Sequence, residues 1–245
     1  MGLSFILRFV AWWQLSHAQS NVGVHAGYIL QGKGGIALGQ GDILAELRGT
    51  ESKFLGVFNQ HKLTSALFVR SELNYYPNSL RSLVRDNGTE SGFCDVVTVG
   101  NVYYRTFEIP MTINLRIAVT RGFAIVVLAG LGLDINLPSG KGPDYTFGTP
   151  TTGVAEVMNA LEHTPKTFLS NYTGGVGFNI WRITLVARYQ HNLSSSLTNN
   201  LHVSGNEYVF DTYSHQLHFS AGYNFHRVKF WKEKEGGTSV KRRTK

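Results

Sequence analysis

The sequence predicts an all-β protein, an eight-stranded antiparallel up-and-down transmembrane β-barrel with long extracellular loops and short periplasmic turns. Three observations predict it. Only 16% of the 245 residues are charged, whereas glycine and aromatic residues are plentiful, as suits strands that face lipid. Long segments alternate between apolar residues and polar or small ones, as half-buried strands do. The connections alternate between long and short, which is typical of outer-membrane barrels.

Eight segments carry the alternation. The clearest runs from Phe123 to Leu137, where the odd positions are apolar and the even ones become small and then polar. The segment 103–117 alternates in the same way, with more polar partners. The other six expected strands are 22–30, 53–59, 67–75, 172–180, 181–189 and 216–225. Periodicity alone does not decide which face lies inside, because a soluble sandwich also alternates.

The connections are expected to be irregular where they are long. The long loops are 31–52, 77–97, 138–167 and 192–212, and the short turns are 60–62, 120–122 and 179–182. A short helix is expected over 154–162, within the third long loop. Pro110 lies in the middle of an expected strand, where it donates no ladder hydrogen bond. We therefore expect a β-bulge at that position.

The chain divides into three expected parts. Residues 1–18 predict a signal peptide, because a short apolar run is followed by Ser16-His17-Ala18, which has small residues at the two positions a signal peptidase inspects. The alternative is a buried first strand or helix. Residues 19–226 form the expected barrel, and residues 227–245 form a basic tail. With an even number of strands both ends of the barrel fall on the short-turn side, so the tail is expected in the periplasm.

Charge and cysteine content exclude several classes of protein. The formal net charge is +7, but the tail supplies +6 and Arg8 the remainder, so the body is neutral. A neutral body argues against a domain that reads nucleic acid, which needs a basic face on the fold. The single cysteine, Cys94, excludes an internal disulfide framework and a cysteine-based zinc cage. No metal site and no cofactor are expected.

Short motifs in the strands carry a family resemblance. They are Ser71-Glu72-Leu73-Asn74-Tyr75-Tyr76, Phe107-Glu108-Ile109-Pro110, Ala129-Gly130-Leu131-Gly132, Gly174-Gly175-Val176-Gly177 and Ala221-Gly222-Tyr223-Asn224-Phe225. In these motifs, which occur in order across most of residues 21–226, the chain resembles the PorT-type small outer-membrane barrels of Bacteroidetes. The resemblance implies an eight-stranded barrel in the outer membrane, and some members of that family assist type IX protein secretion. The basic tail and the signal peptide depart from the family pattern.

The candidate functional residues are polar side chains on the faces that we expect to point inward. They form a predicted barrel-interior polar network: Arg70, Glu72, Glu108, Asn114, Arg116, Asp134, Arg182 and Arg188. Charges in so narrow an interior must be paired. We expect a structural plug of salt bridges and hydrogen bonds, with a narrow polar conduit as the alternative. No catalytic, cofactor-binding or metal-binding residue is predicted.

The predicted function is a non-enzymatic outer-membrane barrel with a structural or accessory role in the cell envelope. Its expected partners are outer-membrane lipid and other envelope or secretion proteins, reached through the loops or the tail. One alternative is a soluble lipocalin-like ligand-binding barrel, which would need an apolar interior. Another is a surface-facing hydrolase built on Asp211, His215 and His218, with His191 and His202 nearby. His215 and His218 have opposite parity on one strand, so they do not share a face.

Overall fold

The architecture is taken from a computed structural model. The described residues are 20–39, 43–86, 96–147, 152–161, 165–194, 200–203, 206–210 and 214–225. The predicted signal peptide, residues 1–18, and the predicted basic tail, residues 227–245, lie outside them.

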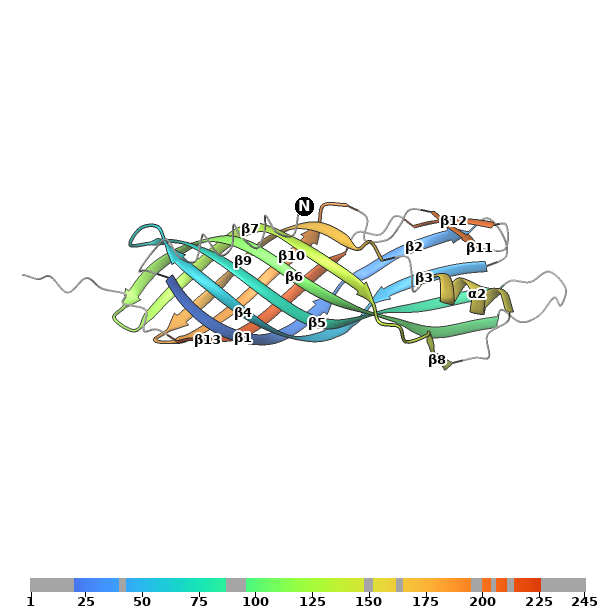
Figure 1. Ribbon diagram of the computed structural model, residues 1–245, viewed down its shortest axis with the longest axis horizontal. Helices are drawn as coiled ribbons and strands as arrows, with labels where there is room; N and C mark the ends of the chain where they lie inside the picture. Colours follow the sequence, from blue (N-terminus) through green and yellow to red (C-terminus); the bar gives the residue numbers. More distant parts are fainter. Residues whose placement is uncertain are drawn as a thin grey trace, which may run out of the picture.

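Eight strands close into a ring (Figure 1). Each pairs antiparallel with the next ring strand along the chain, and the last pairs back with the first, Gly23 lying opposite Asn224. The ring strands are β1 (Ser20–Gln31), β4 (Glu51–Lys62), β5 (Leu67–Asp86), β6 (Val96–Thr120), β7 (Phe123–Pro138), β9 (Phe168–Ile180), β10 (Ile183–Asn192) and β13 (His215–Asn224). All eight coincide with the strands expected from sequence, so the predicted fold class is confirmed.

The two ends of the barrel differ. At one end, called the short-turn end, three tight turns at 63–66, 121–122 and 181–182 join consecutive strands. The first of these lies later than the predicted 60–62, because β4 continues through Lys62. The last places Trp181 in the turn with a φ of 52° rather than in a strand. The opposite end, called the long-loop end, carries all the longer connections.

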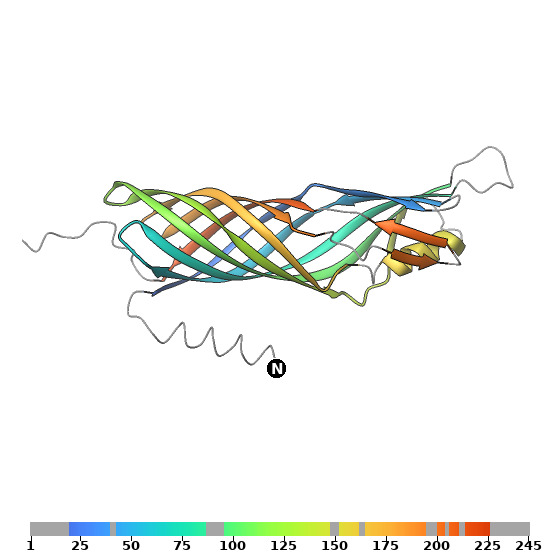
Figure 2. The ribbon, with the colours of Figure 1, turned by 90° about the horizontal axis from the view of Figure 1, so that it is seen from above.

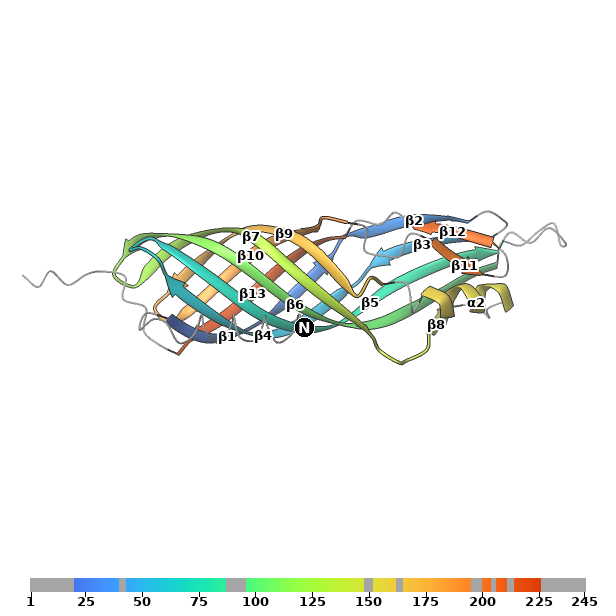
Figure 3. The ribbon, with the colours of Figure 1, turned by 45° about the horizontal axis from the view of Figure 1, so that its top comes forward.

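Much of what was expected as irregular loop is strand. β5 and β6 remain paired as far as Asp86 opposite Val96, so the prediction of a loop over 77–97 is wrong for most of that segment. The segment 31–52 forms β2 (Lys33–Gly39) and β3 (Ile43–Gly49), and β3 pairs with the far part of β5. Further strands are β8 (Asp144–Phe147), β11 (Asn200–Val203) and β12 (Asn206–Phe210). Together they extend the sheet beyond the ring (Figure 3).

In the described part of the chain, the helix α2 (Thr152–Leu161) lies at the long-loop end (Figure 2), where the sequence predicts a helix over 154–162. Its side chains Met158 and Leu161 are buried. The Ser82 hydroxyl donates to the Met158 sulfur at 2.6 Å, and a Cβ on Gly100 would lie only 2.4 Å from the Met158 methyl. Ser82 and Gly100 stand on the inward faces of β5 and β6, so α2 covers the inside of their extension. Among the described residues, no helix is long and apolar enough to cross a membrane.

The alternation resolves into an apolar outside and a polar inside. On β6, Ile113 is 56% exposed, whereas Glu108 is 0% exposed. The outward positions of β6 are apolar from Phe107 to Val119, and the next outward residue toward the long-loop end is the exposed Arg105. At roughly 3.3 Å per residue and a tilt of about 40°, that stretch spans about 30 Å, the thickness of a bilayer's hydrocarbon core. We call the band of outward apolar side chains at this level, on β6 and on the other ring strands, the apolar belt.

Pro110 is accommodated without the predicted bulge, so that expectation is wrong. On one side Pro110 lies opposite Gly132 of β7 in unbroken register. On the other side β5 and β6 keep the same register before and after it, with Ser71 opposite Met111 and Asn74 opposite Glu108. The pairing between these two points is skipped, which removes the need for a donor at the proline. The inside–outside phase of β6 therefore stays constant.

Candidate functional site: the interior polar network

Seven of the eight residues predicted for the interior network are buried inside the barrel. They are Arg70, Glu72, Glu108, Asn114, Arg116, Asp134 and Arg188. Arg182 is the exception: it is exposed in the 181–182 turn, where its Nη1 donates to the Tyr223 hydroxyl at 3.0 Å. The inward assignment of Arg182 is wrong because β10 begins at Ile183, two residues later than expected.

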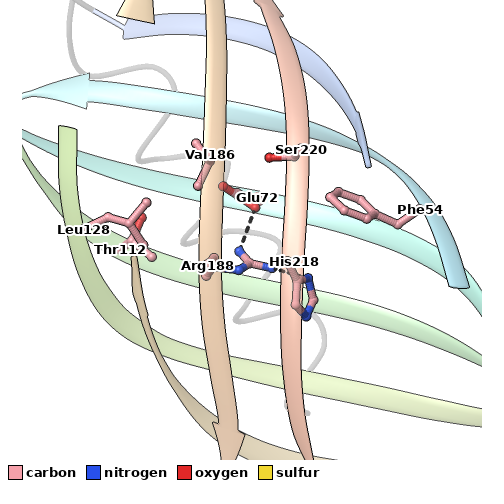
Figure 4. Close-up of a pocket in the computed structure, with 8 residues that line it drawn as sticks. All are labelled: Phe54, Glu72, Thr112, Leu128, Val186, Arg188, His218 and Ser220. Atoms are coloured by element: carbon pink, nitrogen blue, oxygen red, sulfur yellow. Dashed lines mark hydrogen bonds and ion pairs between the residues drawn. The ribbon is translucent and has the colours of Figure 1, made fainter. Parts of the chain in front are cut away.

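Four charged side chains meet at the centre of the barrel and are called the central ion cluster: Arg70, Glu72, Glu108 and Arg188. Arg70 Nε lies 2.7 Å from one oxygen of Glu72, and Arg188 Nη1 lies 3.1 Å from the other. Arg188 Nη2 lies 2.7 Å from Glu108. Each guanidinium therefore meets a carboxylate, and the cluster carries no net charge. Figure 4 shows Arg188 reaching from β10 toward Glu72, with His218 beside it.

Neutral polar groups add hydrogen bonds to this cluster. The Asn74 amide donates to Glu108 at 2.9 Å and to Glu72 at 3.2 Å. Two buried histidines face the guanidinium groups with Nδ1, His25 at 3.3 Å from Arg70 and His218 at 3.1 Å from Arg188. Because a guanidinium only donates, each Nδ1 must be an acceptor, which assigns the proton of each neutral ring to Nε2.

The Nε2 contacts agree with this assignment. His25 Nε2 lies 2.6 Å from the amide oxygen of Asn74, and His218 Nε2 lies 2.9 Å from that of Gln216. Sequence reasoning did not place His25, Asn74 or His218 in the network. Their inward parity is visible in the alternation, but only the register of five strands, β1, β5, β6, β10 and β13, shows that they surround the same charges.

Toward the long-loop end, amides surround the third interior acid. Asp134 accepts from the side-chain amides of Asn171 at 2.9 Å and Gln190 at 3.3 Å. One layer further, Thr106 donates to the Asn136 side chain at 2.8 Å. These buried amide, hydroxyl and carboxyl groups fill the interior above the central ion cluster.

Toward the short-turn end, Arg116 is held by a ring and by amides. Its guanidinium lies 3.9 Å from the centre of the Phe68 ring, a cation–π contact, and Nη2 donates to Gln60 at 3.2 Å. With the Asn179 amide oxygen turned toward it, Arg116 Nε and Nη2 donate to that oxygen at 3.1 and 3.2 Å. Arg70 is stacked in the same way over Phe58, at 4.0 Å. The third interior arginine is thus satisfied without a carboxylate of its own.

The space left at the centre is small. A cavity of about 10 Å³ lies between Phe54, Thr112, Leu128 and the central ion cluster (Figure 4). That is about the room one water molecule requires. At this level the described side chains therefore leave room for about one water molecule beside the central ion cluster.

The histidines of the hydrolase alternative do not assemble a site in the described residues. His215 is exposed on the outside of β13 and His218 is buried inside, as their parity predicts. His215 lies beside His191, with 3.4 Å between their Nδ1 atoms. Asp211 and the side chain of His202 lie outside the described part of the chain. Within that part, no group of three or more His, Cys, Asp or Glu side chains could hold a metal ion.

Comparisons with known proteins give similarity in structure alone. No protein-family model matches the sequence, and no curated protein matches it. The solved structures similar to this chain include the outer membrane protein OprG from Pseudomonas aeruginosa, 12% identical, covering 86% of this chain and 98% of that one, with a TM-score of 0.49. They also include Ail, the attachment invasion locus protein of Yersinia pestis, 13% identical, covering 84% and 99%, with a TM-score of 0.38. The translocator domain of the autotransporter NalP from Neisseria meningitidis is 13% identical, covering 91% and 95%, with a TM-score of 0.27.

These similarities are too distant to transfer an activity. What the chain itself shows is a closed eight-stranded antiparallel barrel, apolar outside and filled inside with paired charges.

Proposed function

We propose that this chain is a non-enzymatic, non-conducting outer-membrane barrel with a structural or accessory role in the cell envelope. The observation that carries the proposal is the inverted polarity of the barrel. Ile113, Leu131 and Leu55 are each more than half exposed on the outside, whereas Arg70, Glu108 and Arg188 are buried inside. In water this arrangement would expose a continuous apolar band far larger than a soluble monomer tolerates. In a bilayer it places each surface in its matching solvent.

The same polarity argues against the lipocalin-like alternative. A soluble ligand-binding barrel keeps an apolar interior with room for its ligand. Here the centre holds the central ion cluster and a cavity of about 10 Å³.

The interior also supports the absence of conduction. An ion crossing the barrel would have to separate Arg188 from Glu72 and Glu108 and leave charges buried without partners. The orientation we propose has the long-loop end outside the cell and the short-turn end, with the basic tail, in the periplasm. An even number of ring strands and the sorting of long and short connections support it.

Two measurements on the purified full-length protein test this proposal. Folded barrel in detergent should migrate differently on electrophoresis before and after heating, and the protein should need an amphiphile to remain folded. Reconstituted into a planar bilayer, it should give no single-channel steps under conditions where an open porin gives them. A protein that folds and stays soluble without any amphiphile would refute the membrane location, and stable channel steps would refute the plug.

A finer proposal is that the barrel assists type IX protein secretion. The resemblance of residues 21–226 to PorT-type barrels supports it. Deleting the gene in the source bacterium should reduce secretion of cargo that uses this pathway, and expression of the intact chain should restore secretion. Normal secretion in the deletion strain would reject this role while leaving the barrel proposal intact.

A further inference from the structure

An apolar groove lies on the outer wall of the barrel. Its volume is about 530 Å³, and it crosses β1, β13, β10 and β9. Volumes of about 300–1,000 Å³ are usual for sites that bind small molecules. The groove is distinct from the interior network, because most of its lining side chains are outward ones within the apolar belt.

The strand register explains the hollow. One outward row across the four strands reads Ala26, Ala221, Leu185 and Phe178. The next row toward the long-loop end reads Tyr28, Phe219, Ala187 and Val176. Small alanine side chains thus lie next to large side chains that project further from the barrel wall, among them Phe178 and Phe219, which are 44% and 47% exposed. The shape suits a flexible hydrocarbon chain lying between rings.

A cation stands at the short-turn side of this groove. The row just below Ala221 and Leu185 contains Tyr223 opposite Ile183. The Tyr223 hydroxyl accepts a hydrogen bond at 3.0 Å from Nη1 of Arg182, which is exposed in the adjoining turn. In the described part of the chain, no carboxylate lies within ion-pairing distance of Arg182. Its remaining donors are therefore available to an anion at the membrane surface.

Within the described residues, the charged groups on the outside and rim of the short-turn end all have the same sign. The segments that form it, 20–24, 58–68, 113–126, 177–185 and 221–225, contain no Asp or Glu. They contain Lys62, Arg121 and Arg182 on the outside or at the rim. Among the residues whose side chains are described, the exposed acids are Glu51, Asp144 and Glu156, and all three lie toward the long-loop end. This end of the barrel therefore favours an anionic membrane surface.

We propose that the groove and Arg182 together form a binding site for an anionic phospholipid of the leaflet at the short-turn end. One acyl chain lies in the groove, and the headgroup phosphate accepts hydrogen bonds from the Arg182 guanidinium, which Tyr223 orients. The proposal rests on the proposed membrane location. It adds a specific lipid, because a groove alone would take any acyl chain, whereas Arg182 selects a negative headgroup.

The test uses full-length protein in nanodiscs of phosphatidylcholine that contain a trace of spin-labelled phosphatidylglycerol or, separately, spin-labelled phosphatidylcholine, each labelled on the acyl chain. Electron paramagnetic resonance then measures the motionally restricted fraction of each lipid. Heat-modifiable migration of the same samples first confirms that each variant is inserted and folded. A sample that never inserts refutes the proposed membrane location, whereas an inserted barrel that shows no preference refutes only the lipid site.

Three variants locate the site. Arg182→Gln should lower the preference for phosphatidylglycerol over phosphatidylcholine about fivefold, because one arginine at the surface contributes about 1 kcal/mol. Ala221→Phe should fill the groove and lower the restricted fraction of both lipids, while lipids around the rest of the apolar belt stay restricted. Arg121→Gln is the matched control, an exposed arginine in the neighbouring turn, and should behave as wild type. An unchanged preference in Arg182→Gln, an equal loss in Arg121→Gln, or an unchanged restricted fraction in Ala221→Phe would overturn the proposal.

Discussion

Replacing Arg188 by methionine is expected to destabilise the barrel severely. The substitution keeps an unbranched side chain about as long as the aliphatic part of arginine and removes the guanidinium that bridges Glu72 and Glu108. Glu72 would retain Arg70 at 2.7 Å, but Glu108, which is fully buried, would keep only the amide of Asn74. The variant therefore leaves one carboxylate in the interior without a counter-charge.

The magnitude follows from that single orphaned charge. Removing one partner of a buried ion pair costs about 3–5 kcal/mol in the free energy of unfolding. With a urea dependence of about 2 kcal/mol/M, the unfolding midpoint should fall by about 1.5–2.5 M. Adding Glu108→Gln to Arg188→Met removes the unpaired charge, so the double variant should recover to within about 1 kcal/mol of wild type.

The assay is reversible urea unfolding in detergent micelles, followed by tryptophan fluorescence and by the heat-modifiable band. Arg182→Met is the matched control, since it removes an exposed arginine from the same hairpin, and it should change stability by less than about 0.5 kcal/mol. If Arg188→Met costs less than about 1 kcal/mol, or if the double variant is no more stable than the single one, Arg188 does not neutralise Glu108 and the reasoning fails.

Two further pairs of substitutions test the outer surface and the inner packing of the wall. Ile113, which is 56% exposed, lies in the middle of the apolar belt, so Ile113→Arg should lower the free energy of unfolding by about 2–4 kcal/mol in phospholipid vesicles. Val119→Arg, near the short-turn end of the same strand, should lower it by no more than about 1 kcal/mol. Equal losses would contradict the depth assigned to these two positions. Gly56→Ala should cost about 1–3 kcal/mol by urea unfolding, because the new Cβ would lie 2.1 Å from the side-chain oxygen of Asn74. Gly174→Ala, whose Cβ would meet nothing closer than 3.9 Å, should be nearly neutral, and a similar loss at both glycines would show that the interior is not packed as described.

The ring strands could be predicted because lipid and interior impose opposite demands on alternate residues. From Phe123 to Leu137 every second side chain is apolar, and that constraint holds wherever the wall crosses the apolar belt. The strands beyond the ring are not predicted, because the alternation that marks the ring strands is missing there. Past Tyr76 the β5 strand reads Pro-Asn-Ser-Leu-Arg-Ser, which has no apolar face, because a sheet in water on its outer side needs none.

The alternation predicts which residues of the network point inward, but it does not predict which of them contact one another. Parity placed Glu72, Glu108 and Arg188 on inward faces, but only the tilt and register of the strands bring residues 116 positions apart to 3.1 Å. The alternation predicts a strand that starts at Trp181, which puts Arg182 on the inward face, whereas both residues lie in the turn. The chain needs two residues to reverse between β9 and β10, so the strand begins at Ile183.

The central claim is that the outward face of β6 touches hydrocarbon from Phe107 to Val119 and leaves it at Arg105. Single spin labels at outward positions 105, 109, 113, 117 and 119, in a Cys94→Ser background in phospholipid vesicles, test it through collisions with oxygen and with a water-soluble nickel chelate. Oxygen access should peak at 113 while nickel access is lowest there, and nickel access should rise at 105 and 119. Nickel access at 113 equal to that at 105 would place this face in water and contradict the account.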